Sequence, residues 1–167
     1  ENNIELILKS FSNLPQIKLL LVGNWSNSSY SKQLRDRYAK FKNLILIDSI
    51  YNYEILNSLR SNCFLYVHGH SAGGTNPSLV EAMNLGLPIF CFDVNFNRQT
   101  TRNSAKFFNS YEQLMDLINN THPKELIKCG KKMKKIAIKE YNWTNISKLY
   151  AKLIDNLFIL FLVICVC

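Results

Sequence analysis

The 167-residue chain lacks the residue patterns that build several common functional sites. It contains only three histidines, and the cysteines upstream of its C-terminal end show no zinc-like pairing. His68 and His70 have no third ligand beside them in the sequence, so we expect no metal site. The Gly-x-Gly-x-x-Gly pattern of nicotinamide dehydrogenases is also missing after the first expected strand, because Gly23 is followed by Asn-Trp-Ser.

The cysteines indicate the compartment. There are five, an odd number, which does not suit a complete disulfide framework. Cys63 and Cys91 fall in expected buried strands, where we interpret them as small core residues, and Cys165 and Cys167 lie in an apolar C-terminal run. Free thiols are typical of a reducing compartment, so we expect a cytoplasmic protein.

Acidic residues are also scarce, with 12 against 20 basic ones and a net charge of +8. The excess is concentrated in seven lysines late in the chain: Lys124, Lys128, Lys131, Lys132, Lys134, Lys135 and Lys139. Apolar residues interleave with them at helical spacing, which predicts an amphipathic helix. Its basic face is either simply solvated or attracted to anionic lipid headgroups, which would place the protein at the inner face of a membrane. No aromatic side chain interleaves with the lysines, so we expect no nucleic-acid partner.

Helical and strand patterns alternate along the chain, which is typical of a parallel α/β sheet. The expected helices cover residues 4–11, 31–41, 54–59, a segment opened by Pro77, 111–118, 123–140 and 145–156, and the expected strands cover residues 17–22, 44–47, 63–67, 88–92 and 106–108. The strands are continuous apolar runs, which implies cover on both faces. The predicted fold class is therefore α/β, with a doubly wound, Rossmann-like parallel sheet.

In such sheets, ligands bind beyond the carboxyl ends of the strands. The residues expected at this edge come from four loops, at 23–25, 48–51, 68–76 and 93–95. Their convergence predicts a single binding cleft.

The segment from Val67 to Met83 carries the most specific pattern, and it reads Val-His-Gly-His-Ser-Ala-Gly-Gly-Thr-Asn-Pro-Ser-Leu-Val-Glu-Ala-Met. A strand leads into a Gly-rich loop, and Pro77 suits the first turn of a helix. Free N–H groups and the positive end of the helix dipole favour phosphate there, while Gly73 and Gly74 allow close approach. The glycines could also serve only to form a tight turn. Glu81 lies about one turn further in, which suits hydrogen bonds from sugar hydroxyls better than contact with phosphate.

This segment resembles family 4 of the GT-B glycosyltransferases, whose pattern is a Glu, seven residues, and a second Glu followed by Ala-Met or similar. The second Glu is Glu81, followed here by Ala-Met-Asn-Leu-Gly-Leu-Pro, and the first is replaced by Gly73. The run from His70 to Leu79 resembles the bacterial rhamnosyltransferase-like branch, in which Gly-Gly-Thr-Asn-Pro stands at this place. The missing carboxylate at position 73 fits a deoxy sugar.

The resemblance extends from Glu1 to about Tyr150 and implies the C-terminal, donor-binding half of a GT-B enzyme. We expect residues 1–156 to form the nucleotide-sugar binding domain without its first strand, which would lie upstream with an N-terminal acceptor domain. Residues 157–167 are an uncharged apolar tail, shorter than the roughly 20 residues of a membrane span. The tail fits a buried last helix, a truncated membrane segment or the product of a disrupted reading frame.

The resemblance implies transfer of a hexosyl-type sugar, rhamnose in this branch, from a nucleoside-diphosphate sugar to a glycan or lipid-linked glycan, with retention. The full-length enzyme would perform it, and this part alone would be inactive. The donor-binding residues it implies are Gly23, Asn24, Ile50, Tyr51, His70, Ser71, Gly73, Gly74, Thr75, Asn76 and Glu81. No catalytic residue is assigned, and neither a metal nor a cofactor is expected.

Two alternatives remain open at the level of sequence. One is a non-catalytic nucleotide-sugar-binding or membrane-associated module that uses the basic helix and the apolar tail. The other is a sugar-nucleotide epimerase on the same fold, for which only His68, His70 and Asp93 could act as acid or base.

Overall fold

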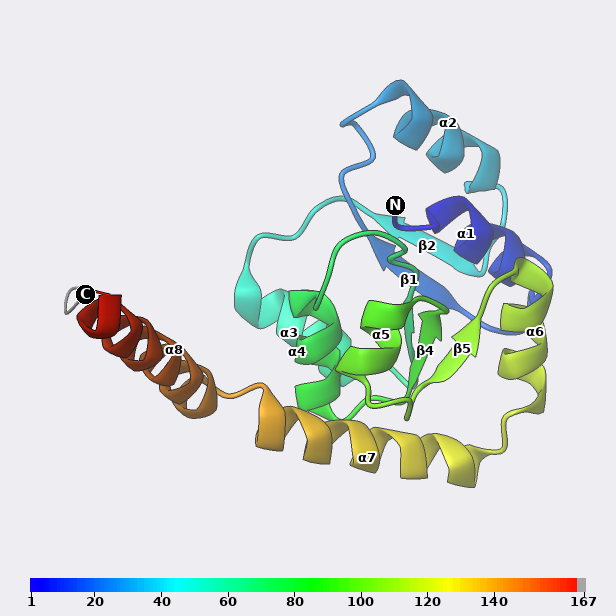
Figure 1. Ribbon diagram of the computed structural model, residues 1–167. Coiled ribbons are helices and arrows are strands. Elements are labelled where there is room, and N and C mark those ends of the chain that lie inside the picture. The colour runs from blue at the N-terminus through cyan, green and yellow to red at the C-terminus, as the bar shows by residue number, and fades with distance from the viewer. Residues whose placement is uncertain (165–167) are drawn as a thin grey trace.

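A computed structural model describes the backbone of residues 1–164 and the side chains of residues 1–156. Helices and strands alternate through most of it (Figure 1). The helices are α1 (Ile4–Ser12), α2 (Ser29–Tyr38), α3 (Tyr53–Ser61), α4 (Pro77–Leu85), α5 (Asn95–Thr100), α6 (Tyr111–Asn120), α7 (Pro123–Glu140) and α8 (Trp143–Ile164). The strands are β1 (Leu19–Val22), β2 (Leu44–Ile47), β3 (Tyr66–His68), β4 (Ile89–Phe92) and β5 (Lys106–Phe108).

All strand pairs are parallel, as predicted, but they form two hydrogen-bonded sheets rather than one. β1 pairs with β2, and β3, β4 and β5 pair in that order. Among the described residues, no strand lies between β1 and β3 to bridge them. Hydrogen bonding between the strands therefore stops between β1 and β3, where the described residues supply no bridging strand.

Helices cover both faces of the strands, which confirms the doubly wound arrangement. Neighbouring residues of β4 point to opposite sides, as a strand requires. Phe90 packs into one core with residues of α1, α2 and α6, whereas Ile89 and Cys91 pack into another with residues of α4 and α7. Because both faces of the strands pack into a core, consecutive residues along a strand are apolar rather than alternating with polar ones.

Several boundaries agree with the sequence prediction, and others differ by one residue or more. β2, β5 and α7 have the predicted bounds. The strand predicted over 63–67 begins only at Tyr66, and Cys63 lies in the turn after α3, half-buried, with its thiol donating to the carbonyl of Leu59 at 3.3 Å. Its placement in a buried strand was wrong because the first residues of this apolar run lie in the turn that follows α3, where Phe64 is exposed. The short helix α5 was not predicted.

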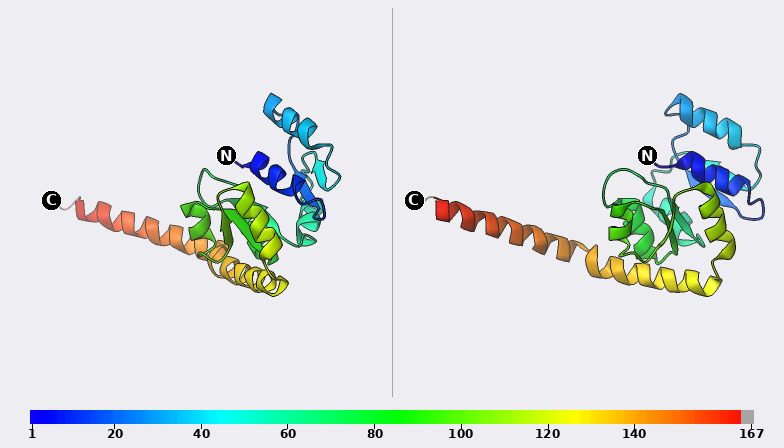
Figure 2. Two further views of the ribbon diagram at one scale, coloured as in Figure 1. Left: turned by 90° about the vertical axis from the view of Figure 1, so that its right-hand side faces the viewer. Right: turned by 45° about the vertical axis from the view of Figure 1, so that its right-hand side comes forward.

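α8 extends away from the other elements (Figures 1 and 2). It begins at Trp143 and continues through Ile164, so the first part of the predicted apolar tail is helical; residues 165–167 lie outside the described residues. Among the described residues, no helix combines the length and the apolar character needed to cross a bilayer.

Candidate functional site

The loop between β3 and α4 presents a row of unused backbone N–H groups. Within the described residues, no hydrogen bond uses the amides of residues 72 to 76, which are Ala-Gly-Gly-Thr-Asn. The next amide, that of Ser78, donates to the side-chain oxygen of Asn76 at 2.9 Å and so caps α4. Consecutive free donors that lead into a helix N-terminus form an anion-binding arrangement.

The two glycines of this loop differ in whether the backbone conformation requires glycine. Gly73 has a φ of 107°, which side chains rarely adopt, whereas Gly74 is not in the left-handed region. A Cβ on either residue would meet no atom within 4 Å. The backbone therefore requires glycine at position 73, and nothing in the fold requires it at position 74.

The start of α4 follows the sequence pattern. Asn76 is extended and caps the helix through its side chain. Pro77 occupies the first turn, where the missing N–H of proline removes no hydrogen bond within the helix. The Asn76 oxygen is consequently occupied by the helix, so this residue offers a ligand its backbone N–H and its side-chain amide group.

The base of the loop is held by buried polar groups. The side chain of Asn97, in α5, donates to the carbonyls of His70 and Phe92, each at 2.9 Å. His68 is buried and stacks on His70 with 5.6 Å between ring centroids. Burial, with a smaller effect from His70, lowers the pKa of His68 to about 4, so this ring is neutral at physiological pH. Its Nε2 has no hydrogen-bond partner among the described residues.

The N-terminal residues close one side of the loop. The backbone N–H of Ser71 donates to the carbonyl of Glu1 at 2.8 Å, and the Asn3 side chain donates to the carbonyl of Gly69 at 2.8 Å. Gly69 is buried there, and a Cβ on it would lie 2.2 Å from the carbonyl oxygen of Asn2. No local pattern in the sequence indicates this close approach.

Gly23 and Asn24 line a separate hollow of about 550 Å³, which includes no residue of the loop after β3. It is lined by residues of the N-terminal segment, the end of β1 and the start of α2, among them Glu1, Asn2, Asn3, Gly23, Asn24 and Tyr30. Since Glu1 also bonds Ser71, the N-terminal segment lies between this hollow and the loop. Ile50 and Tyr51 follow β2; Ile50 is half-buried, and Tyr51 is 89% exposed.

Glu81, on α4, forms an ion pair with Arg60 of α3. Arg60 is the more buried partner, with 18% of its side chain exposed against 42% for Glu81. The pair leaves Oε1 of Glu81 without a partner among the described residues. Sequence reasoning missed Arg60, because a pair formed across two helices leaves no local pattern.

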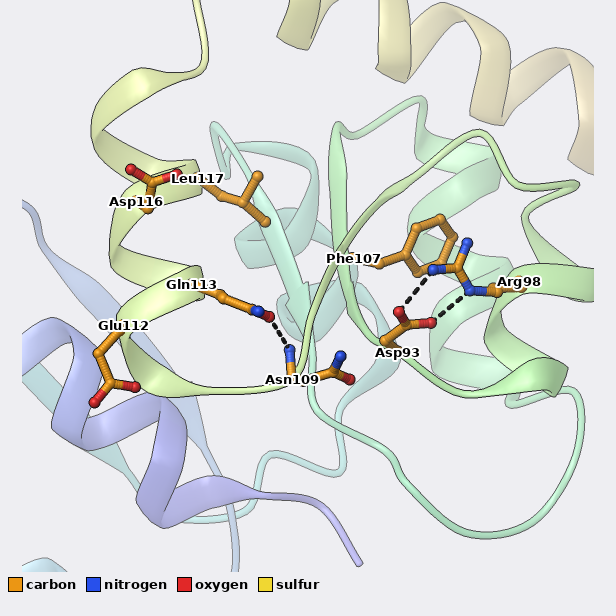
Figure 3. Close-up of a pocket in the computed structure, with 8 residues that line it drawn as sticks. All are labelled: Asp93, Arg98, Phe107, Asn109, Glu112, Gln113, Asp116 and Leu117. Atoms are coloured by element: carbon orange, nitrogen blue, oxygen red, sulfur yellow. Dashed lines mark hydrogen bonds and ion pairs between the residues drawn. The ribbon is translucent and has the colours of Figure 1, made fainter.

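A second hollow of about 460 Å³ lies past the ends of β4 and β5 (Figure 3). Arg98 holds Asp93 through two hydrogen bonds, of 2.5 and 2.6 Å, and lies 4.3 Å from the centroid of Phe107. These bonds hold the pKa of Asp93 below its usual range. Glu112 and Asp116 add negative charge, so this hollow does not suit a phosphate as the loop after β3 does.

Residues 69–73, Gly-His-Ser-Ala-Gly, also match the Gly-x-Ser-x-Gly pattern of hydrolase nucleophiles. The geometry argues against that role. The Ser71 hydroxyl donates to the carbonyl of Glu1 at 3.0 Å, and α4 begins only at Pro77 rather than directly after the serine. No hydrogen bond between Ser71 and a histidine is present within the described residues.

Among the described residues, no three His, Cys, Asp or Glu side chains lie together in a way that could hold a metal ion. His68 and His70 stack as rings rather than converging with a third ligand.

The backbone resembles several solved glycosyltransferases. The crystal structure of Anabaena Alr3699/HepE in complex with UDP-glucose matches with a TM-score of 0.77 and 16% identity, over 91% of this chain and 44% of that one. Sucrose-phosphate synthase from Thermosynechococcus elongatus matches with a TM-score of 0.78 and 20% identity, over 94% and 42%. WaaG, a glycosyltransferase involved in lipopolysaccharide biosynthesis, matches with a TM-score of 0.70 and 15% identity, over 89% and 42%. At these identities the likeness shows the fold.

The chain spans less than half the length of these structures. No curated protein matches its sequence significantly. The fold is that of the Rossmann-like C-terminal domain of GT-B glycosyltransferases, as predicted. The sequence model of the family described as glycosyl transferases group 1 matches residues 1–143, and the chain therefore belongs to that family.

Proposed function

We propose that the loop after β3 and the N-terminus of α4 bind the diphosphate of a nucleoside-diphosphate sugar. The observation that carries the proposal is the row of unused amides at residues 72–76, which leads into a capped helix N-terminus. Each helix N-terminus carries the equivalent of roughly half a positive charge. Amides and dipole together favour a dianionic group without a metal, and the proposal includes none.

The donor's nucleoside is assigned to residues on either side of this loop. Arg60 fixes one oxygen of Glu81, and the other oxygen is available to accept hydrogen bonds from ribose hydroxyls. Tyr51 offers an exposed ring, which with Ile50 would flank the base. UDP and UDP-glucose are bound in the matching Anabaena structures, which supports a nucleotide-sugar donor here.

The sugar is proposed to be a deoxy sugar such as rhamnose. Gly73 provides no carboxylate to accept a bond from a sugar hydroxyl, so a donor that lacks a hydroxyl loses less at this position than an ordinary hexose does. Ser71, His70 and Thr75 would contact the hydroxyls that remain.

The loop's role in the reaction follows from the negative charge that develops on the departing diphosphate. As the bond between the anomeric carbon and the diphosphate oxygen breaks, its electron pair leaves with the nucleoside diphosphate, and the amides stabilise that charge. An acceptor hydroxyl, on a glycan or lipid-linked glycan, forms the new bond to the anomeric carbon, and its proton passes to the departing diphosphate. The proposed transfer proceeds with retention, and the loop's share of catalysis is positioning and charge stabilisation.

Transfer is proposed for the whole protein, because the chain spans less than half the length of its structural relatives. We propose that the reaction takes place in the cytoplasm. For the chain alone we expect weak binding of nucleoside diphosphate and no turnover. By contrast, the relatives in which UDP-glucose or UDP is bound have longer chains.

Calorimetry with UDP, dTDP and uridine tests the proposal, together with an assay for sugar transfer. Binding of the diphosphates but not of uridine would support the phosphate site. Equal binding of UDP and uridine would contradict it. Sugar transfer by the chain alone would contradict the assignment of activity to the whole protein, and interconversion of UDP-sugars without an acceptor would favour an epimerase instead.

A further inference from the structure

Three polar side chains at the C-terminal end of α5 are fully buried. Asn97, Thr100 and Thr101 are each at most 1% exposed, although the helix is only six residues long. Burying a polar group is unfavourable unless hydrogen bonds within the protein replace those made to water. The partners of these three side chains therefore indicate what α5 does.

The side-chain amide of Asn97 joins two neighbouring parallel strands at their carboxyl ends. It donates one hydrogen bond to the carbonyl of Phe92, the last residue of β4, and one to the carbonyl of His70, two residues past the end of β3. Both N–H groups of the amide are thereby used. His70 in turn lies two residues before the row of unused amides at 72–76, so Asn97 fixes the backbone where this row begins.

The oxygen of the same side chain has no hydrogen-bond partner among the described residues, although it is buried. An unpaired buried acceptor is destabilising. A leucine has a similar size and would fill the space without an unpaired oxygen. The amide at position 97 is therefore explained by its two donated hydrogen bonds and not by packing.

Thr100 reaches the other end of the row. Its hydroxyl lies 3.4 Å from the hydroxyl of Thr75, which directly precedes the helix cap Asn76. Asn97 and Thr100 are three residues apart, so they lie on the same face of α5. This face consequently contacts the loop after β3 both before the row of amides and within it.

α5 is itself fixed at both ends. Arg98 binds Asp93, which precedes the helix, through two hydrogen bonds (Figure 3). At the other end, the hydroxyl of Tyr141, which follows α7, donates to the carbonyl of Thr100 at 3.1 Å. A helix of six residues is marginal without tertiary contacts, and these contacts make it a firm support for its neighbours.

The loop after β3 has no comparable bonds of its own. Within the described residues, no hydrogen bond involves the backbone N–H or carbonyl groups of residues 72–75. Gly73 and Gly74 also have more conformational freedom than other residues. Such a loop would not keep its amides in one arrangement unaided, so its conformation depends on the contacts at its two ends.

We propose that Asn97 and Thr100 are positioning residues that hold the loop after β3 in the conformation that binds a diphosphate. This inference rests on the proposed function of the loop. Both side chains are too buried to touch a donor, so Asn97 acts through the carbonyl of His70 and Thr100 acts through Thr75. Amides that are already in place bind an anion without the entropy cost of ordering the loop.

An NMR titration with UDP tests the proposal, because it reports the order of each loop amide as well as the affinity. Asn97→Leu removes both donors to the strand ends. Without ligand, the backbone at residues 72–76 should become more mobile than in the wild-type chain. The affinity for UDP should fall about tenfold, since ordering the backbone of one residue costs roughly that factor.

Thr100→Val and Thr101→Val form a matched pair. Each replaces a buried hydroxyl with a methyl group, and each loses a bond to the carbonyl four residues earlier, of 2.7 Å for Thr100 and 2.8 Å for Thr101. Both should therefore lower the Tm by a similar amount. Only Thr100 reaches the loop, so only Thr100→Val should loosen it and weaken UDP binding, by about two- to fivefold for one weak hydrogen bond. This pair decides the question even if Asn97→Leu does not fold.

UDP affinity equal to the wild type in both Asn97→Leu and Thr100→Val would overturn the proposal. Equal losses of affinity in Thr100→Val and Thr101→Val would also overturn it, because they would show only that a less stable α5 weakens binding. Either result leaves the donor assignment intact as long as the wild-type chain binds UDP. Absence of UDP binding by the wild-type chain would instead overturn the proposed function, and this inference with it.

Discussion

Glu81 and Arg60 form an ion pair between α4 and α3. The pair uses one carboxylate oxygen of Glu81 and leaves the other for a ligand. Arg60 thereby orients the carboxylate that we assign to the ribose hydroxyls, so a change at either residue would affect both packing and donor binding.

Replacing Glu81 with Gln should weaken nucleotide binding about tenfold to a hundredfold. The available carboxylate oxygen is charged, whereas the amide oxygen of a glutamine is neutral, and charge-assisted hydrogen bonds contribute about 1.5–3 kcal/mol. Calorimetry with UDP measures the change. Glu54→Gln, on the exposed start of α3, is the matched control and should leave the affinity unaltered. An unaltered affinity in the Glu81 variant would remove this residue from the donor site.

The two loop glycines should respond differently to substitution. Gly74→Val should abolish UDP binding with little change in Tm, because the fold has open space for the side chain and a φ outside the left-handed region, whereas the valine would fill the space of the diphosphate. Calorimetry and thermal unfolding on one preparation measure both effects.

Gly73→Ala is the comparison for that experiment. Its positive φ predicts a lower Tm even without ligand, because alanine strains the backbone there. If Gly74→Val lowered the Tm but bound UDP normally, the loop would be a simple turn, and the phosphate assignment would be wrong.

The elements with correctly predicted bounds are those whose signals lie within one continuous stretch of the sequence. β2 is a continuous apolar run between polar turns, and α7 is opened by Pro123 and has an apolar stripe between lysines, so both have the predicted bounds. The pattern behind the proposed phosphate-binding loop is also local, since the strand, the glycines and the helix start follow one another.

The remaining features depend on contacts between distant segments. β3 is shifted because its register is set by pairing with β4, and α5 is six residues long with no periodic pattern. The Glu81–Arg60 pair and the contact of Asn97 with His70 join separate elements, and Gly69 is required by the N-terminal segment that lies against it. None of these could be inferred from spacing along the chain.

Acid should destabilise the fold through His68. Burial lowers its folded pKa from 6.5 to about 4, so the unfolded chain takes up a proton between these values and the folded chain does not. The stability that this neutral ring contributes is complete above pH 6.5 and lost as pH falls to about 4. The loss amounts to about 3 kcal/mol, since a pKa difference of one corresponds to about 1.4 kcal/mol.

Urea unfolding at several pH values measures this dependence. His68→Leu should flatten it over that range, while His70→Gln should retain most of it, because burial is the larger cause of the lowered pKa. A pH dependence that is identical in the wild type and the His68 variant would mean that the ring titrates normally in the folded protein.

Replacing Gly130 with Ala should lower the Tm. A Cβ at this position would lie 2.2 Å from the carbonyl oxygen of Gly86 and 3.3 Å from the nitrogen of Pro88, so α7 must move away from α4 and the start of β4. Such overpacking costs about 1–3 kcal/mol, and the better helix propensity of alanine offsets up to about 1 kcal/mol. Gly23→Ala is the matched control, because its Cβ would lie 3.8 Å from Leu21, an ordinary contact. A Gly130 variant at least as stable as the wild type would show that α7 is not held this closely in solution.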